Sequence, residues 1–282
     1  MRILRYVLPV LALVAGAGLA VTGPSQAVTP HYYVALGDSL SRGYQPGQGD
    51  TTQGYVNDFY QKLKAHDSSL QLISLGCSGE TTGSMINGGV CTDRYPDSSQ
   101  SQLTTAVAFL KAHLGAVTYL TIDIGANDVD GCASGGSIDA ACVAKGLVTI
   151  GQNLTTILPA LVTADGGKPF SIGMTYYDPF LAEWLTGTTG KAVATASVPL
   201  AYGLNSELGA AYVAAGFRVA DVGGAFQTGN FTTRQLVLPY GFLPTNVANI
   251  CKWTYMCSVN NIHANPAGYG VIATIFARVA KI

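Results

Sequence analysis

The chain has few charged residues and no block of one charge. Only 11% of its 282 residues are Asp, Glu, Lys or Arg, and the formal net charge is −1. Nucleic-acid-binding proteins usually carry a basic patch, and disordered chains are poor in apolar residues, whereas 48% of this chain is hydrophobic. The composition therefore excludes a nucleic-acid partner and predicts a folded chain with a large core.

Patterns typical of zinc sites are also missing. No Cys-x-x-Cys occurs, and the four histidines are scattered along the chain, at His31, His66, His113 and His263. No apolar run after residue 27 looks long enough to span a bilayer. We therefore predict no metal site and no stable membrane anchor.

Residues 1–27 have the features of a cleaved signal peptide. Arg2 and Arg5 give a positive start, residues 6–21 are apolar, and the segment ends in small residues before Ala27. The apolar part is shorter than the ~20 residues that a membrane span needs. We expect cleavage after Ala27 and a secreted, extracellular, monomeric protein with a single domain over residues 28–282.

Six cysteines follow in the mature chain, as three pairs of sequence neighbours. In an oxidising compartment this even number favours disulfides, and local pairing would close three short loops rich in turn residues. The predicted pairs are Cys77 with Cys91, Cys132 with Cys142, and Cys251 with Cys257.

Strand-like and helix-like segments alternate along the mature chain. Apolar runs predict strands over 31–36, 70–75, 117–124, 169–175 and 217–222, and helical spacing predicts helices over 55–64, 102–114, 140–162, 192–215 and 267–280. Pro199 should break or kink the fourth helix, and residues 223–258 read as a long loop. The alternation indicates an α/β fold with a mostly parallel sheet and helices on both faces.

Three polar segments directly follow predicted strands. They contain Ser39 in Gly-Asp-Ser-Leu, Gly79 in Ser-Gly-Glu-Thr, and Asn127 in Gly-Ala-Asn-Asp. Ligands of parallel sheets bind beyond the carboxyl ends of the strands, so these residues should meet there. Taken singly, each also fits an ordinary turn or cap role. Together they suit a serine nucleophile with oxyanion donors.

A serine nucleophile needs a base, and His263 is the best placed histidine. It lies in a loop segment that runs directly into the last predicted helix, whereas the other three fit structural or solvated positions. These four blocks, with Asn265-Pro266-Ala267-Gly268-Tyr269 after the histidine, resemble the GDSL, or SGNH, hydrolase family. The order and spacing of the blocks agree across almost the whole mature chain, and the cysteine pairs are similar to those of its secreted bacterial lipases and esterases.

The resemblance implies a fold and a mechanism. The fold would be a three-layer α/β/α sandwich with a flavodoxin-like sheet. Ser39 would be the nucleophile and His263 the general acid and base, and the oxyanion donors would be Ser39, Gly79 and Asn127. No metal or organic cofactor is implied, and the substrate would be an ester, such as a lipid.

The sequence departs from the family at the acid that should precede the histidine. Asn260 and Asn261 stand there, and neither carries a negative charge. We therefore predict that a main-chain carbonyl within residues 251–261 accepts the hydrogen bond of the imidazole. Asp178 and Asp221, which follow later strands, are alternative acceptors for the imidazole, although we expect turn or cap roles for both.

The substrate class stays open at this level. An aromatic cluster at Tyr176, Tyr177, Phe180 and Trp184 could line an acyl pocket, pack in the core or stack on a sugar. A lipase or esterase is the main hypothesis. A polysaccharide acetylesterase and a non-catalytic binding protein on the same fold are the alternatives.

Overall fold

The computed structural model describes residues 30–95, 100–134 and 136–282. The predicted signal peptide, residues 1–27, lies outside the described residues, so both it and the domain boundary after it stay predictions.

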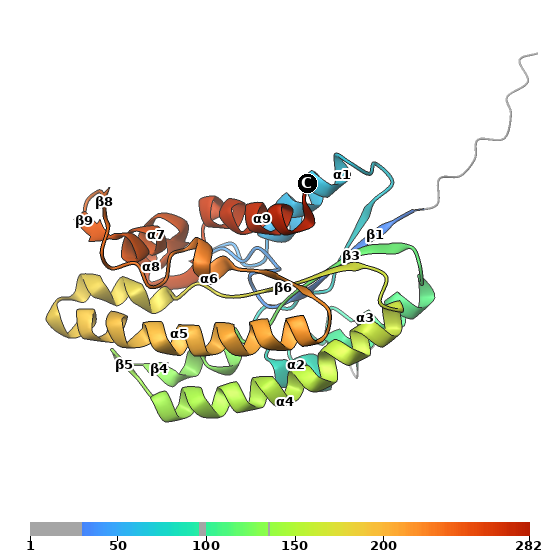
Figure 1. Cartoon of the computed structure of the whole chain (residues 1–282), viewed down its shortest axis with the longest axis horizontal. Coiled ribbons are helices and arrows are strands. Elements are labelled where there is room, and N and C mark those ends of the chain that lie inside the picture. Colours follow the sequence, from blue (N-terminus) through green and yellow to red (C-terminus); the bar gives the residue numbers. More distant parts are fainter. Residues whose placement is uncertain (1–29, 96–99, 135) are drawn as a thin grey trace, which may run out of the picture.

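A five-stranded parallel sheet forms the centre of the fold (Figure 1). Its order is β2-β1-β3-β6-β7, which is the flavodoxin-like order with its switch point between β1 and β3. The five strands are those that the apolar runs predicted. They are β1 (Tyr32–Gly37), β2 (Gln71–Ser74), β3 (Val117–Asp123), β6 (Phe170–Met174) and β7 (Arg218–Ala220).

Helices cover both faces of this sheet, which confirms the three-layer α/β/α fold. In Figure 1, α1 (Tyr55–Lys64) and α9 (Pro266–Ala280) lie above the sheet, and α3 (Gln102–Ala112), α4 (Ala140–Asp165) and α5 (Thr188–Ala214) lie below it. The sequence accounts for several of the helix starts. Ser101 begins α3 with a capping box, and the Asn265 side chain caps α9 directly before Pro266.

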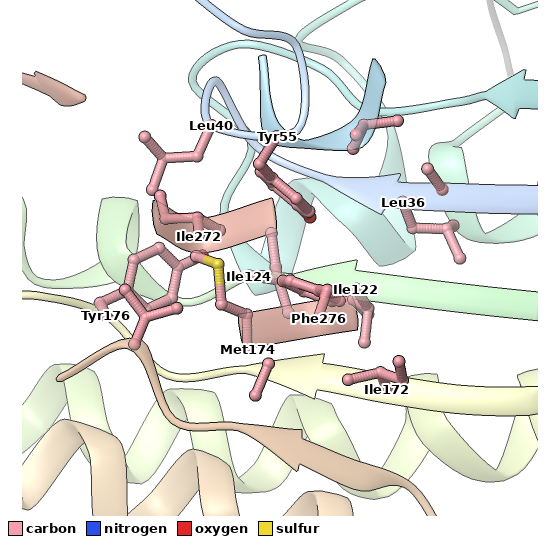
Figure 2. Close-up of a cluster of buried hydrophobic side chains, with 14 of the residues drawn as sticks. Leu36, Leu40, Tyr55, Ile122, Ile124, Ile172, Met174, Tyr176, Ile272 and Phe276 are labelled. Carbon is pink, nitrogen blue, oxygen red and sulfur yellow. The ribbon is translucent and has the colours of Figure 1, made fainter. Parts of the chain in front are cut away.

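The core lies between the sheet and these two layers. Figure 2 shows Leu36, Ile122 and Ile172 on neighbouring strands, with Ile272 and Phe276 of α9 close by. All five side chains are fully buried. A parallel sheet covered on both faces needs such continuous apolar strands, which explains why the strands could be predicted from their composition.

Helix α4 differs from one expectation. Its 26 residues are long and apolar enough to span a membrane by length and composition, although no later span was predicted. In this fold it packs against α3 and α5 and buries Ile150, Leu154 and Ile157. The apolar side chains of α4 thus serve the lower layer of the sandwich.

Pro199 does not break the fourth predicted helix, and the prediction of a long loop over residues 223–258 was wrong. Helix α5 continues through Pro199 because its packing along α4 and the segment η3 (Pro179–Thr186) outweighs the local cost of the proline. The predicted loop over residues 223–258 is largely structured. It contains most of α6 (Val222–Ala225), together with β8 (Arg234–Val237), β9 (Gly241–Pro244), α7 (Thr245–Trp253), β10 (Thr254–Tyr255) and most of α8 (Met256–Val259).

The remaining elements are short and lie around the carboxyl end of the sheet. They are α2 (Thr82–Asn87), η1 (Ala126–Asp128), η2 (Asp130–Cys132), β4 (Ala133–Ser134), β5 (Ser137–Ile138) and β11 (Asn261–Ala264). The six cysteines form the three local pairs that their spacing favoured, with Cα separations of 5.9, 5.5 and 5.0 Å for Cys77–Cys91, Cys132–Cys142 and Cys251–Cys257. Each disulfide fixes a loop beside this end of the sheet.

Candidate active site

Ser39 lies in the turn that follows β1, at the carboxyl edge of the sheet. The preceding Gly37 has φ 141°, and a Cβ there would overlap the Asp123 carboxylate, so only glycine fits. The side chain of Gln102 holds Gly37 from α3, since its Oε1 accepts from the Gly37 N–H at 2.6 Å and its Nε2 donates to the Gly37 carbonyl at 3.0 Å. These hydrogen bonds therefore fix the end of β1, two residues before Ser39.

Two buried carboxyl groups lie beneath this turn. Asp38 is 2% exposed and Asp123 is fully buried, and they hydrogen-bond to each other. The Tyr176 hydroxyl donates to Asp38 Oδ2 at 2.7 Å, and the Tyr55 hydroxyl donates to Asp123 Oδ1 at 2.6 Å. The main-chain N–H of Ser41 also donates to Asp123 Oδ2, at 3.2 Å. These hydrogen bonds of Asp38 and Asp123 help to hold the Ser39 turn in place.

The two carboxyl groups raise the cost of ionisation in this buried site. Burial raises the pKa of both groups, and the pKa of Asp123 rises well above its ordinary value because the negative charge of Asp38 adds to the burial. Two carboxyl groups in contact cannot both ionise without a large electrostatic cost, and this cost falls more strongly on Asp123. Neither residue was predicted as part of the site, although Asp38 stands beside Ser39 in the sequence.

The structure brings His263 and Ser39 together from opposite ends of the chain. His263 lies on β11, and its Nε2 is 2.8 Å from Ser39 Oγ. Its Nδ1 is 2.8 Å from the side-chain oxygen of Asn261, which also accepts from the His263 main-chain N–H at 3.1 Å. An amide oxygen can only accept, so Nδ1 carries the proton and Nε2 is free to accept the proton of Ser39.

The predicted main-chain acceptor for the imidazole was therefore wrong. The acceptor is a carbonyl oxygen, but it belongs to the side chain of Asn261, at the position where the family usually has an acid. An amide and a carboxylate have nearly the same shape, and this similarity is the signal that sequence reasoning missed. Asn260 takes no part, since it adopts a left-handed conformation with φ 53° at the end of α8. Asp178 and Asp221 cap η3 and α6, as expected.

The surroundings of His263 keep the imidazole neutral. Tyr44 packs against the ring with a centroid distance of 4.3 Å, and burial lowers the pKa of His263 to about 4, although the charge of Asp50 opposes this shift. At neutral pH the imidazole can therefore act as a base. The Tyr44 main-chain N–H donates to the Ser39 carbonyl at 3.1 Å, so the same residue contacts both predicted catalytic groups.

Gly79 and Asn127 lie in adjoining loops after β2 and β3. Gly79 has φ 84°, which favours glycine, and the Cys77–Cys91 disulfide closes its loop. The side-chain amide of Asn127 donates to the Glu80 carbonyl at 2.9 Å and so joins the two loops. Within the described chain, the main-chain N–H groups of Ser39 and Gly79 donate to no other residue.

A cleft with a volume of about 90 Å³ opens beside these groups. Ser39, Asn127 and His263 line it, whereas Gly79 is not among its lining residues. The other walls are mainly apolar and come from several elements, including Leu40, Val129, Ile138, Val143, Phe180, Leu200, Leu204 and Ile262. Such a cleft suits an apolar ligand with one polar end.

Comparison with known proteins decides the family. The profile of the GDSL-like lipase/acylhydrolase family matches residues 35–271, which is most of the chain. The chain belongs to this family. Its membership supports an ester hydrolase.

Solved structures of a lipase and an esterase share the fold. An extracellular lipase from Streptomyces rimosus is 18% identical, with a TM-score of 0.55, over 88% of this chain and 99% of that chain. An acetylxylan esterase from Geobacillus stearothermophilus is 16% identical, with a TM-score of 0.53, over 89% of this chain and 94% of that chain. No curated protein sequence matches significantly. At these identities the structural likeness supports the fold alone.

Asp130 and Asp178 also line the cleft of this GDSL-family protein, and Asp178 is the residue that caps η3. The Asp130 carboxylate lines the cleft and accepts no hydrogen bond from any residue in the described part of the chain. Burial, helped by the charge of Asp38, raises the pKa of Asp130 to about 6. No group of three His, Cys, Asp or Glu side chains could hold a metal ion within residues 30–95, 100–134 and 136–282.

Proposed function

We propose that this protein hydrolyses carboxylic esters through an acyl-enzyme on Ser39, with His263 as general base and then general acid. One observation carries the proposal. The hydrogen bonds from Ser39 Oγ to His263 Nε2 and from His263 Nδ1 to Asn261 Oδ1 are both 2.8 Å long. This relay has the geometry that a serine nucleophile needs, with an acceptor that fixes the tautomer of its base.

The residues would act in two half-reactions. His263 Nε2 takes the proton of Ser39 as Oγ attacks the ester carbonyl, and the same nitrogen then protonates the departing alcohol oxygen. In the second half, His263 takes a proton from water, which attacks the acyl carbon and displaces Ser39 Oγ. Ser39 recovers its proton, and the products are an alcohol and a carboxylic acid.

The oxyanion would meet three donors. The main-chain N–H groups of Ser39 and Gly79 have no other acceptor among the described residues, and Asn127 uses one of its two amide protons on the Glu80 carbonyl. Its second proton is left for the substrate. Donors held in fixed positions stabilise the charge that develops on the carbonyl oxygen.

The apolar cleft favours an acyl chain over an acetyl group. Because an acetyl group would leave most of its walls uncovered, we expect longer acyl esters, including lipids, to react with higher kcat/KM. The protein would act after export, as a monomer. The signal-like residues 1–27 and the three disulfides support this location.

A series of nitrophenyl esters of increasing acyl length tests the proposal. We expect kcat/KM to rise with chain length and Ser39→Ala to lose activity by at least about 10⁴-fold with an unchanged Tm. Ser206→Ala, an exposed serine on α5, is the matched control and should keep full activity. Turnover by purified Ser39→Ala would contradict the mechanism. No turnover of any ester would favour a binding protein, and a preference for acetyl esters would favour the polysaccharide acetylesterase.

A further inference from the structure

The hairpin of β8 and β9 exposes large apolar side chains. Leu236 and Phe242 pair directly across the two strands and are 54% and 67% exposed, and Leu238 in the turn is 81% exposed. Tyr240 adds a half-exposed ring. These four side chains form what we call the hairpin ridge. Eleven large apolar residues are exposed in the described chain, and four of them lie on this one hairpin.

The ridge is not the inner face of the hairpin. Val237 and Leu243 are buried at 8% and 5% exposure and pack against the core. An antiparallel pair with one face on the core normally carries polar side chains on the other. Leu236 and Phe242 break this rule on the solvent side, where they contribute no core packing. Contiguous exposed apolar side chains mark an interaction surface.

The stretch of sequence that contains the ridge has charged side chains of one sign. From Val222 to the last residue the chain has no Asp or Glu, but it has Arg234, Lys252, Arg278 and Lys281. Two of these cations flank the hairpin. Arg234 donates to the Phe242 carbonyl at 3.2 Å, and Lys252 Nζ donates to Gln235 Oε1 at 2.6 Å. Both side chains remain exposed. Apolar side chains bordered by cations are typical of protein segments that lie on anionic lipid surfaces.

The hairpin also lies at the functional end of the molecule. In Figure 1 it stands at the same end as the β4–β5 hairpin, beyond the carboxyl ends of the central strands. The Tyr240 hydroxyl donates to the Cys257 carbonyl at 2.6 Å, and residue 257 precedes β11, which carries His263. A surface contacted by the ridge would therefore lie at the same end of the molecule as the cleft.

We propose that the hairpin ridge inserts into the surface of an anionic lipid bilayer, with Arg234 and Lys252 contacting lipid phosphates. A projecting, convex turn fits a fluid surface, which can close around Leu238. This inference goes beyond the proposed ester hydrolysis and does not require it. Docking would hold the mouth of the cleft beside lipid molecules.

Co-sedimentation with vesicles of non-hydrolysable diether lipids tests the proposal apart from catalysis. We expect the protein to bind vesicles that contain an anionic lipid and the double variant Leu238→Ser, Phe242→Ser to lower the partition coefficient by at least about tenfold. The double variant Leu114→Ser, Val213→Ser is the matched control, because both side chains are exposed but precede the amino ends of β3 and β7. It should bind as the unmodified protein does.

The charge contribution is tested separately. The double variant Arg234→Gln, Lys252→Gln should lower the partition coefficient on anionic vesicles by about tenfold and leave weak binding to neutral vesicles unchanged. Absence of vesicle binding, or equal binding by the ridge and control variants, would overturn the proposal. A ridge variant that only converts a dimer to a monomer in light scattering would assign the ridge to a second copy and also overturn it. Hydrolysis of a soluble short-chain ester, measured in parallel, should be the same in all these variants, so that a failure of docking is distinguished from a failure of the esterase mechanism.

Discussion

The two halves of the candidate site are held in different ways. The Ser39 turn rests on the core, where the fully buried side chains of Gln102 and Asp123 bond to main-chain groups of Gly37 and Ser41. Asp38, which is also almost fully buried, accepts from the Tyr176 hydroxyl. His263 lies outside the central sheet, on a two-stranded sheet of β10 and β11, and its segment is only half buried. One half depends on the packing of the whole domain, and the other depends on a few individual side-chain contacts.

Because of this difference, we expect changes in the two halves to affect stability and activity separately. Removing a buried polar partner beneath Ser39 leaves other buried groups unpaired and costs folding free energy. Removing a contact of His263 leaves the core intact and affects the orientation of one side chain. Changes in the first half should therefore lower stability, and changes in the second should lower turnover at nearly constant stability.

Among the changes that compare the supports of the two halves, the largest effect is expected at Asn261. Asn261→Ala removes the acceptor of His263 Nδ1, so the imidazole loses both its preferred tautomer and its orientation, and kcat should fall on the order of 10²–10³-fold. Asn260→Gly is the control, since glycine suits the left-handed conformation of that neighbouring residue. The measurement is ester turnover together with the melting temperature. Equal activity in the two variants would show that Asn261 does not position the histidine.

The next largest effect is a loss of stability when a buried group beneath the Ser39 turn is removed. Asp123→Ala leaves the Tyr55 hydroxyl and the Ser41 N–H without their acceptor and should lower the free energy of unfolding by about 3 kcal/mol. Asp221→Ala, which removes the N-cap of α6 and the acceptor of the Thr175 hydroxyl, should cost about 1 kcal/mol. Urea unfolding monitored by circular dichroism measures both. If Asp123→Ala costs no more than the cap variant, the carboxyl pair does not support the turn.

The smallest effect is a shift in pH dependence. His263 must be neutral to act as a base, and burial lowers its pKa to about 4, so kcat/KM should persist through mildly acidic pH and fall only as the pH drops through about 4. Asn261→Asp places a negative charge beside the ring, which favours the protonated imidazole and should move this acid limb to higher pH. The pH profile of kcat/KM for a soluble ester measures it. An acid limb that stays in place in Asn261→Asp would mean that residue 261 does not face the imidazole during catalysis.

Local sequence patterns determined much of this protein. The five apolar runs became the five central strands because a sheet covered on both faces requires them, and helix 55–64 was predicted to the residue because its apolar spacing matches one buried face. The cysteine pairs could be predicted because each pair of sequence neighbours closes a short loop. Ser39, Gly79, Asn127 and His263 could be named because each lies in a short motif.

Contacts between distant segments were decided only by the tertiary structure. Asp38 and Asp123 are 85 positions apart and interact only because β1 and β3 are neighbours in the sheet. Helix α5 passes through Pro199 because packing outweighs a local propensity, and residues 223–258 form hairpin and helix because they fold onto η3 and α9. The role of Asn261 could also be seen only in the folded protein. An amide oxygen can replace a carboxylate as the acceptor only where the fold directs it at the imidazole, as it does here.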